Sequence, residues 1–141
     1  MKKVDTINLV HHRNRAESYM TGIKLLGDDI EHYGHCVTLM AIHSAISFTD
    51  AVLIGCTGQR SNEADHNAVL KPMLKLCGTR RIEPDGVNHL RWLLSRKTDF
   101  VYGDAVVTVK DMRLAKVKAE RYQIWVYQCF PELKDESHSN H

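Results

Sequence analysis

One arginine and one histidine have the types and spacing that metal-free cleavage of a phosphodiester needs. Arg60 and His66 are separated by five residues and follow the most apolar stretch of the chain. Cutting a ribonucleotide chain requires an imidazole-like group that moves protons near neutral pH and a cation that stabilises the charge developing on the phosphate. Spacing alone would arise by chance, but this pair also flanks a predicted helix start, where free backbone amides attract phosphate oxygens. The pair indicates a phosphate-related role.

Geometry limits how the two side chains can converge. Along one continuous helix, six residues would separate Arg60 and His66 by about 9 Å along the axis and rotate them about 120° apart. Either Arg60 lies in the preceding loop and folds back, or a twofold axis brings two copies together so that four side chains line one groove. The second arrangement requires a homodimer. In either case Ser61 and Asn62 are expected to assist with hydrogen bonds.

His43 and Asp50 are ionisable side chains inside the apolar stretch, seven residues apart and therefore on one helical face. Because a buried polar group usually has a partner, they predict a satisfied core pair or contacts with backbone. The alternative is that they support the groove of Arg60 and His66 from behind.

A rival cluster could bind zinc. His32, Cys36 and His43 fall on one helical face, with His35 close by, and imidazole and thiolate are zinc ligands. However, Gly34 is expected to break the helix between them, and no further ligand stands at zinc-motif spacing. We predict no metal and no cofactor.

Basic residues gather around one predicted helix, with Trp92 among them. Such a surface could track a nucleic-acid backbone, or it could be an ordinary solvated face, with Trp92 in the core. The basic residues are Arg80, Arg81, Arg91, Arg96 and Lys97. We take Arg80, Arg81 and Arg91 as weak candidates for RNA binding.

The elements that must position these residues follow from composition. The chain has 141 residues, 43% of them apolar, with 8 Gly and 3 Pro, which predicts a single all-α domain. A net charge of +2 is too small to indicate a nucleic-acid binder by itself. Four scattered cysteines without a CxxC pair, and no signal peptide, indicate reduced thiols in the cytoplasm. Residues 36–58 could span a bilayer, but their polar side chains favour a core helix over a membrane segment.

The apolar pattern predicts a bundle of helices with short connections. We expect Gly34 to separate the first two helices and Gly78 to end the third, which Ser61 or Asn62 caps and Pro72 kinks. Thr108 and Asp111 predict the cap of the last helix, and Pro131 its end. The predicted helices are 14–32, 35–55, 61–77, 83–96 and 108–129, with a connection over 97–107, and the domain covers 1–131 with a polar tail at 132–141.

At this point the sequence resembles a known family. The run AIHSAISFTDAVLIGCTGQRSNEADHNAVLKPMLKL, then LLSRKTDFVYGD, then a long final helix, is similar to small stand-alone HEPN-domain proteins over roughly residues 14–130. The resemblance implies an up-and-down bundle of four to five helices, a homodimer with composite sites, and metal-independent ribonuclease activity in many members. The family motif, Arg followed by four to six residues and His, maps onto Arg60 and His66.

Two departures from the family pattern stand out. Ser61 replaces the Asn, Asp or His that often follows the motif Arg, and Ala68 stands where toxins paired with a nucleotidyltransferase antitoxin carry Tyr. Two hypotheses follow. The chain is a ribonuclease with a toxin or defence role, or it is a non-catalytic dimerisation module that binds RNA, a nucleotide or an antitoxin-like protein.

Overall fold

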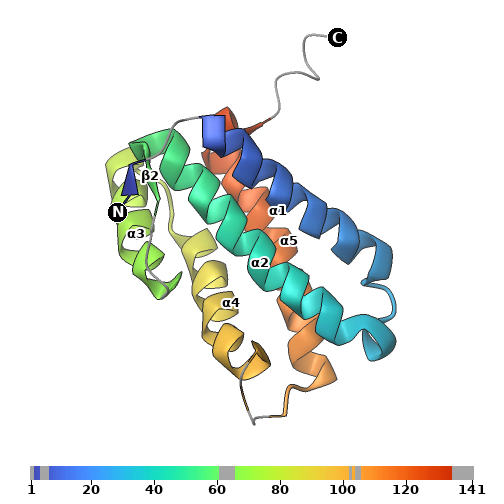
Figure 1. The fold of residues 1–141 in the computed structure, drawn as a ribbon. Helices are drawn as coiled ribbons and strands as arrows, with labels where there is room; N and C mark the ends of the chain where they lie inside the picture. Colours follow the sequence, from blue (N-terminus) through green and yellow to red (C-terminus); the bar gives the residue numbers. More distant parts are fainter. Residues whose placement is uncertain (1, 4–6, 61–65, 102, 104–105, 135–141) are drawn as a thin grey trace, which may run out of the picture.

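Helices pack side by side around a central helix in the computed structural model, which describes residues 2–3, 7–60, 66–101, 103 and 106–134 (Figure 1). The α-helices of the described part are α1 (Ile7–Leu26), α2 (Ile30–Thr57), α3 (Leu70–Arg80), α4 (Asp85–Val101) and α5 (Val109–Cys129). Two 3-10 helices, η1 (His66–Val69) and η2 (Pro131–Leu133), and an antiparallel pair of two-residue strands, β1 (Lys2–Lys3) and β2 (Gln59–Arg60), complete it. The predicted all-α bundle is confirmed.

The central helix is α2, which packs against α1, α4 and α5 (Figure 1). Small residues such as Ala41 and Ala45 let neighbouring helices approach closely, and Phe48 and Val52 are fully buried. By length and composition α2 could cross a membrane, but 78% of its most apolar stretch is buried inside the protein. Burial of this kind agrees with the predicted core helix.

The expected break at Gly34 is wrong, because α2 runs through this residue without interruption. A Cβ at Gly34 would lie 2.3 Å from the Met112 sulfur of α5, so glycine here permits close helix packing and does not end a helix. The chain turns earlier, where the Asp29 side chain accepts the N–H of His32 at 3.2 Å and caps α2. Helix α1 correspondingly begins at Ile7, seven residues before the predicted start.

The third helix begins and ends later than predicted. Its first described turn is η1, and the expected caps, Ser61 and Asn62, lie outside the described residues. Pro72 stands in the first turn of α3, where backbone N–H groups have no helical acceptor, so the expected cause of a kink is absent. The helix also continues past Gly78, and the left-handed residue that ends it is Arg81, with φ 57°.

The last two helices follow the prediction more closely. Helix α4 extends to Val101 and so includes the first residues of the expected connection over 97–107. The connection is therefore shorter than predicted. The Thr108 side chain accepts the N–H of Asp111 at 3.1 Å, and α5 ends at Cys129, which confirms both predicted ends. The α5 residues buried against the core are Met112, Ala115, Ala119, Tyr122, Trp125 and Val126.

The packed part of the chain continues beyond the expected boundary at residue 131. Leu133 in η2 is fully buried, and its carbonyl accepts a hydrogen bond from buried Arg13 at 3.2 Å. The first residues of the predicted polar tail therefore belong to the fold, whereas 135–141 lie outside the described residues.

Candidate functional site

The predicted pair lies on the connection from α2 to α3. The backbone of Arg60 belongs to β2, and that of His66 begins η1. Their side chains, and all of Ser61 and Asn62, lie outside the described part of the chain. The backbone of Arg60 therefore precedes the helical turn that begins at His66.

The end of α2 determines where this connection starts. Gly58 adopts the left-handed region with φ 71° and donates its N–H to the Ile54 carbonyl at 2.9 Å, which glycine does without steric cost. The Thr57 hydroxyl donates to the Leu53 carbonyl at 2.5 Å and accepts the N–H of Gln59 at 3.2 Å. These bonds turn the chain out of the helix and into β2.

The N-terminal residues pair with the strand that contains Arg60. In the β1–β2 ladder, the backbone of Lys2 pairs with that of Arg60, and Lys3 pairs with Gln59. The ladder therefore places three basic residues among its four positions.

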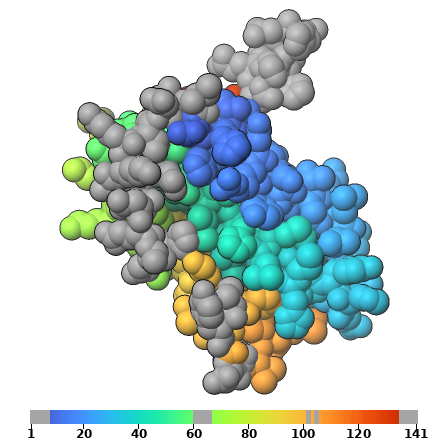
Figure 2. Space-filling view, viewed as in Figure 1, coloured from blue at the N-terminus to red at the C-terminus, as the bar shows by residue number. Residues whose placement is uncertain are grey.

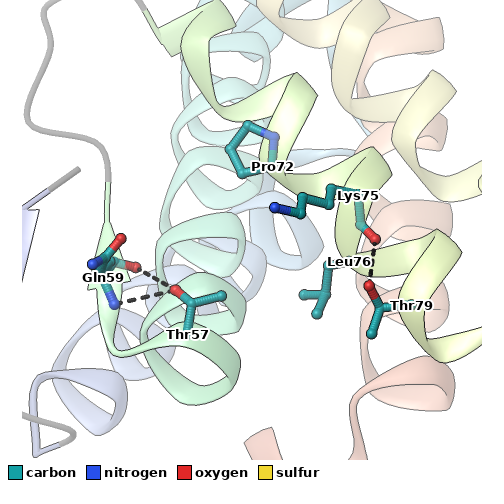
Figure 3. Close-up of a pocket in the computed structure, with 6 residues that line it drawn as sticks. All are labelled: Thr57, Gln59, Pro72, Lys75, Leu76 and Thr79. Carbon is teal, nitrogen blue, oxygen red and sulfur yellow. Dashed lines mark hydrogen bonds between the residues drawn. The ribbon is translucent and has the colours of Figure 1, made fainter.

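A pocket of about 410 Å³ lies between β2 with the end of α2 on one side and α3 on the other (Figure 3). This volume is typical of small-ligand sites. Figure 3 shows the Lys75 ammonium reaching from α3 toward the side that carries Thr57 and Gln59. The pocket is lined by Thr57, Gln59, Pro72, Lys75, Leu76 and Thr79.

A charged cluster holds α3 beside this pocket. Arg80 forms an ion pair with Glu132 of η2 at 2.6 Å, and its guanidinium lies 5.2 Å from the centre of the Phe130 ring. The Cys56 thiol donates to the same carboxylate at 3.4 Å. Arg80, a predicted RNA contact, is therefore paired with a carboxylate of the same chain, although its side chain is partly exposed.

The cluster also shifts proton affinities. Burial would raise the pKa of the Glu132 carboxyl, but hydrogen bonds from Arg80, its own backbone and Cys56 outweigh burial, so the pKa lies below its ordinary value. Burial and the bond to Glu132 raise the pKa of the Cys56 thiol to about 11. The cysteine stays a neutral thiol near neutral pH and serves as a donor, not as a nucleophile.

The other two candidate RNA contacts lie apart from this pocket. Arg81 is the exposed C-cap of α3, and Arg91 in α4 donates to the Asn88 side chain of the same helix at 2.9 Å. Neither lines the pocket.

His43 and Asp50 contact different neighbours. The His43 and Tyr19 rings pack with their centres 5.8 Å apart. Burial lowers the pKa of the His43 imidazole, and the nearby Lys97 charge lowers it further. Asp50 lies 4.0 Å from Nδ1 of His12 in α1. Both candidates thus bridge α2 to adjacent helices. Figure 2 shows α2 reaching the surface between α1 and α4, so the two half-buried side chains stand on a helix that is accessible from one face.

The zinc cluster considered from the sequence is dispersed. Cys36 is exposed, His35 packs on Phe100 at 5.3 Å, and His32 lies 3.9 Å from Asp29. Among the described residues, no group of three or more histidines, cysteines or carboxylates is arranged to hold a metal ion.

Sequence reasoning missed four contributors. Lys2 and Lys3 reach Arg60 only through strand pairing, and Lys75 reaches the pocket only through tertiary packing. His12 is buried in α1 beside Asp50, a pairing that only the packing of α1 on α2 brings about. The usable signal was Asp50 itself, because a carboxylate in an apolar helix calls for a polar or cationic partner on a neighbouring element.

No family model, curated protein or solved structure matches the chain, so the HEPN resemblance remains a prediction that rests on the quoted residues.

Proposed function

We propose that the chain is a metal-independent endoribonuclease of the HEPN type, with Arg60 and His66 as its catalytic residues on the α2–α3 connection. The observation that carries the proposal is the convergence of basic residues at this connection: Lys2 and Lys3 pair with its first strand, and Lys75 lines the adjoining pocket. A phosphodiester is the ligand that such a site fits, because it is anionic and small enough for a pocket of about 410 Å³.

In the proposed reaction the ribose 2′-oxygen attacks the adjacent phosphorus, and the 5′-oxygen of the next nucleotide leaves. His66 takes the 2′-hydroxyl proton or supplies the proton to the leaving oxygen, and Arg60 stabilises the charge on the pentavalent phosphate. Ser61 and Asn62 donate hydrogen bonds to the same phosphate. Lys75 neutralises a neighbouring phosphate in the pocket, and the product carries a 2′,3′-cyclic phosphate.

A homodimer in the cytoplasm, with an antitoxin-like protein as a further partner, belongs to this proposal. Partly exposed apolar side chains on α2, Tyr33 and Leu39, favour contact with a second copy. In such a dimer, residues of both protomers would form one composite groove.

The second candidate is a non-catalytic module that binds RNA or a nucleotide at the same pocket. Ser61 in place of the usual Asn, Asp or His favours it. Both functions use the same cations, and they differ in turnover.

The test uses a labelled mixed RNA pool in EDTA. Wild type is compared with Arg60→Ala, His66→Ala and Lys75→Gln, and with Lys24→Gln, an exposed cation in the last turn of α1, as the matched control. We expect cyclic-phosphate products, a loss of about 100-fold or more in the first two variants, a smaller loss in Lys75→Gln and none in the control. Helicity and oligomer mass must be unchanged. Binding without cleavage by wild type would favour the second candidate, and cleavage that survives both alanine variants would refute the assigned residues.

A further inference from the structure

The surface shared by α4 and α5 carries a tryptophan with two cations near its ring. The Arg96 guanidinium lies 5.2 Å from the centre of the half-buried Trp92 ring, and the Lys118 ammonium lies 6.0 Å from it. Both distances are in the range of cation–π contacts. A nucleotide has a flat base and an anionic phosphate. The indole ring could stack with the base, and the nearby cations could contact the phosphate.

Arg121 adds positive charge near the same surface. Burial lowers the pKa of the His89 imidazole, helped by the charges of Lys118 and Arg121 and opposed by Asp85, and His89 precedes Trp92 by about one helical turn. Arg96 also lies 3.8 Å from partly exposed Asp99, a pair that solvent screens. The cations near the ring are therefore only partly compensated.

Two nitrogen atoms here lack a hydrogen-bond partner within the described part of the chain, Nδ1 of His89 and Nε of Arg96. Buried polar atoms in proteins are almost always paired. A ligand rich in acceptor oxygens would give Arg96 the partner it lacks after a small side-chain rotation.

We propose that this α4–α5 surface binds single-stranded nucleic acid, with a base stacking on Trp92 and phosphates contacting Arg96 and Lys118. The inference rests on the proposed function, because it supplies the surface along which RNA outside the cleavage site lies. Stacking on an aromatic ring accepts every base, so the surface binds without sequence preference.

Single-stranded nucleic acid fits better than an acidic peptide or a lipid surface. An acidic peptide would pair with the cations but would leave the indole without a flat partner. A lipid surface requires aliphatic side chains around the aromatic ring, whereas the Trp92 ring has Arg96 and Lys118 near it.

The experiment titrates the full chain with an oligothymidylate of about twelve nucleotides, a length within the site sizes of such surfaces. This probe lacks the 2′-hydroxyl, so binding is measured without cleavage. Tryptophan fluorescence reports stacking, and anisotropy of a labelled oligonucleotide reports affinity at several salt concentrations.

We expect quenching with wild type and a loss of about tenfold or more in affinity for Trp92→Leu. Trp92→Phe should keep the affinity within about threefold, since phenylalanine still stacks, but lose the quenching, because Trp125 is only 6% exposed. Arg96→Gln and Lys118→Gln should each reduce the steepness of the plot of log binding constant against log salt concentration by about 0.7, the value for one lost phosphate contact to a single strand. Lys24→Gln should bind as wild type does.

Three results would overturn the inference. They are unchanged binding by Trp92→Leu at normal helicity, an equal loss in Lys24→Gln, and full displacement of the oligonucleotide by polyglutamate or anionic vesicles at matched charge. In Arg60→Ala and His66→Ala, the tryptophan quenching by the oligonucleotide should keep its full amplitude, because it reports stacking on Trp92 and buried Trp125 does not contribute. A failure of cleavage with intact binding would therefore count against the proposed function alone, and lost binding with intact cleavage would count against this surface alone.

Discussion

Two helical glycines should respond to alanine in opposite directions, because one packs against a fixed ring and the other faces open space. A Cβ at Gly86 would lie 1.9 Å from Cδ2 of Trp125, whereas one at Gly78 would meet no atom within 4 Å. The indole cannot simply move aside. Its N–H donates to the Glu83 carbonyl at 3.1 Å, and it packs between Tyr122 and Phe130 with ring centres 5.7 and 5.6 Å away.

The expected magnitudes follow from these contacts. Overpacking at Gly86 costs about 1–3 kcal/mol, and a weakened indole hydrogen bond costs about 1 kcal/mol more. The better helix propensity of alanine returns up to about 1 kcal/mol. We therefore expect Gly86→Ala to lower the free energy of unfolding by about 1–3 kcal/mol, and each kcal/mol corresponds to about 3 °C in Tm for a chain of this length.

Gly78→Ala should instead raise the free energy of unfolding by about 0.5–1 kcal/mol, because it removes backbone entropy from the unfolded chain at a helical position. Gly58→Ala is the informative control. Its surroundings are also empty, but its φ of 71° makes alanine unfavourable by about 1–2 kcal/mol.

Urea unfolding followed by far-UV circular dichroism measures all three variants, with equal m-values as the check on two-state behaviour. If Gly78→Ala destabilised the protein as much as Gly58→Ala, Gly78 would be the helix terminus that the sequence suggested, and the observed end of α3 at Arg80 would be wrong. If Gly86→Ala changed stability by less than about 0.5 kcal/mol, the packing of α4 on Trp125 would be refuted.

Two further predictions concern the cluster beside the pocket. Iodoacetamide at a pH of about 8 should alkylate exposed Cys36 well before Cys56, because the Cys56 pKa of about 11 leaves little thiolate. Peptide mass spectrometry measures the two alkylation rates. Equal rates would contradict the burial of Cys56 and its hydrogen bond to Glu132. Glu132→Gln should cost about 0.5–1 kcal/mol at neutral pH, a small value because Arg80 and Glu132 are each 36% exposed. The folded-state pKa of Glu132 is lowered, so the stability difference between wild type and Glu132→Gln should be present above the unfolded-state pKa. It should vanish as pH falls through the folded-state pKa. A stability difference that grows in acid would show that the pKa of Glu132 is not lowered by folding.

Local chemistry explains what could be predicted about the fold. The cap formed by Thr108 and Asp111 depends on four consecutive residues, so it is visible in the sequence and confirmed in α5. Gly34 and Gly78 were misjudged because glycine has two uses, ending a helix and allowing close packing, and only the neighbours decide between them. Met112, 78 residues away in the chain, decides the case of Gly34.

The candidate site also has local features that the sequence predicts and long-range pairings that it does not. The polar run between two apolar segments places Arg60 before the third helix, although the predicted start at residue 61 is earlier than the first described turn at His66. The pairing of Lys2 with Arg60, and of His12 with Asp50, joins distant positions whose spacing carries no periodic signal. Charge partners across elements are therefore the part of the site that sequence reasoning could not supply.

The cluster around Glu132 connects stability to the proposed site. Arg80 directly follows Thr79, and Cys56 directly precedes Thr57, so the ion pair and thiol hydrogen bond join the residues next to two walls of the pocket. The separation of α3 from the end of α2 is thus set by contacts to η2. Catalytic sites depend on a rigid frame that holds functional side chains in position. In the proposed site this frame carries Lys75, and the α2–α3 connection carries Arg60 and His66. If the proposal holds, a change at Glu132 should alter the affinity of the pocket for phosphate, although Glu132 is not one of the lining residues.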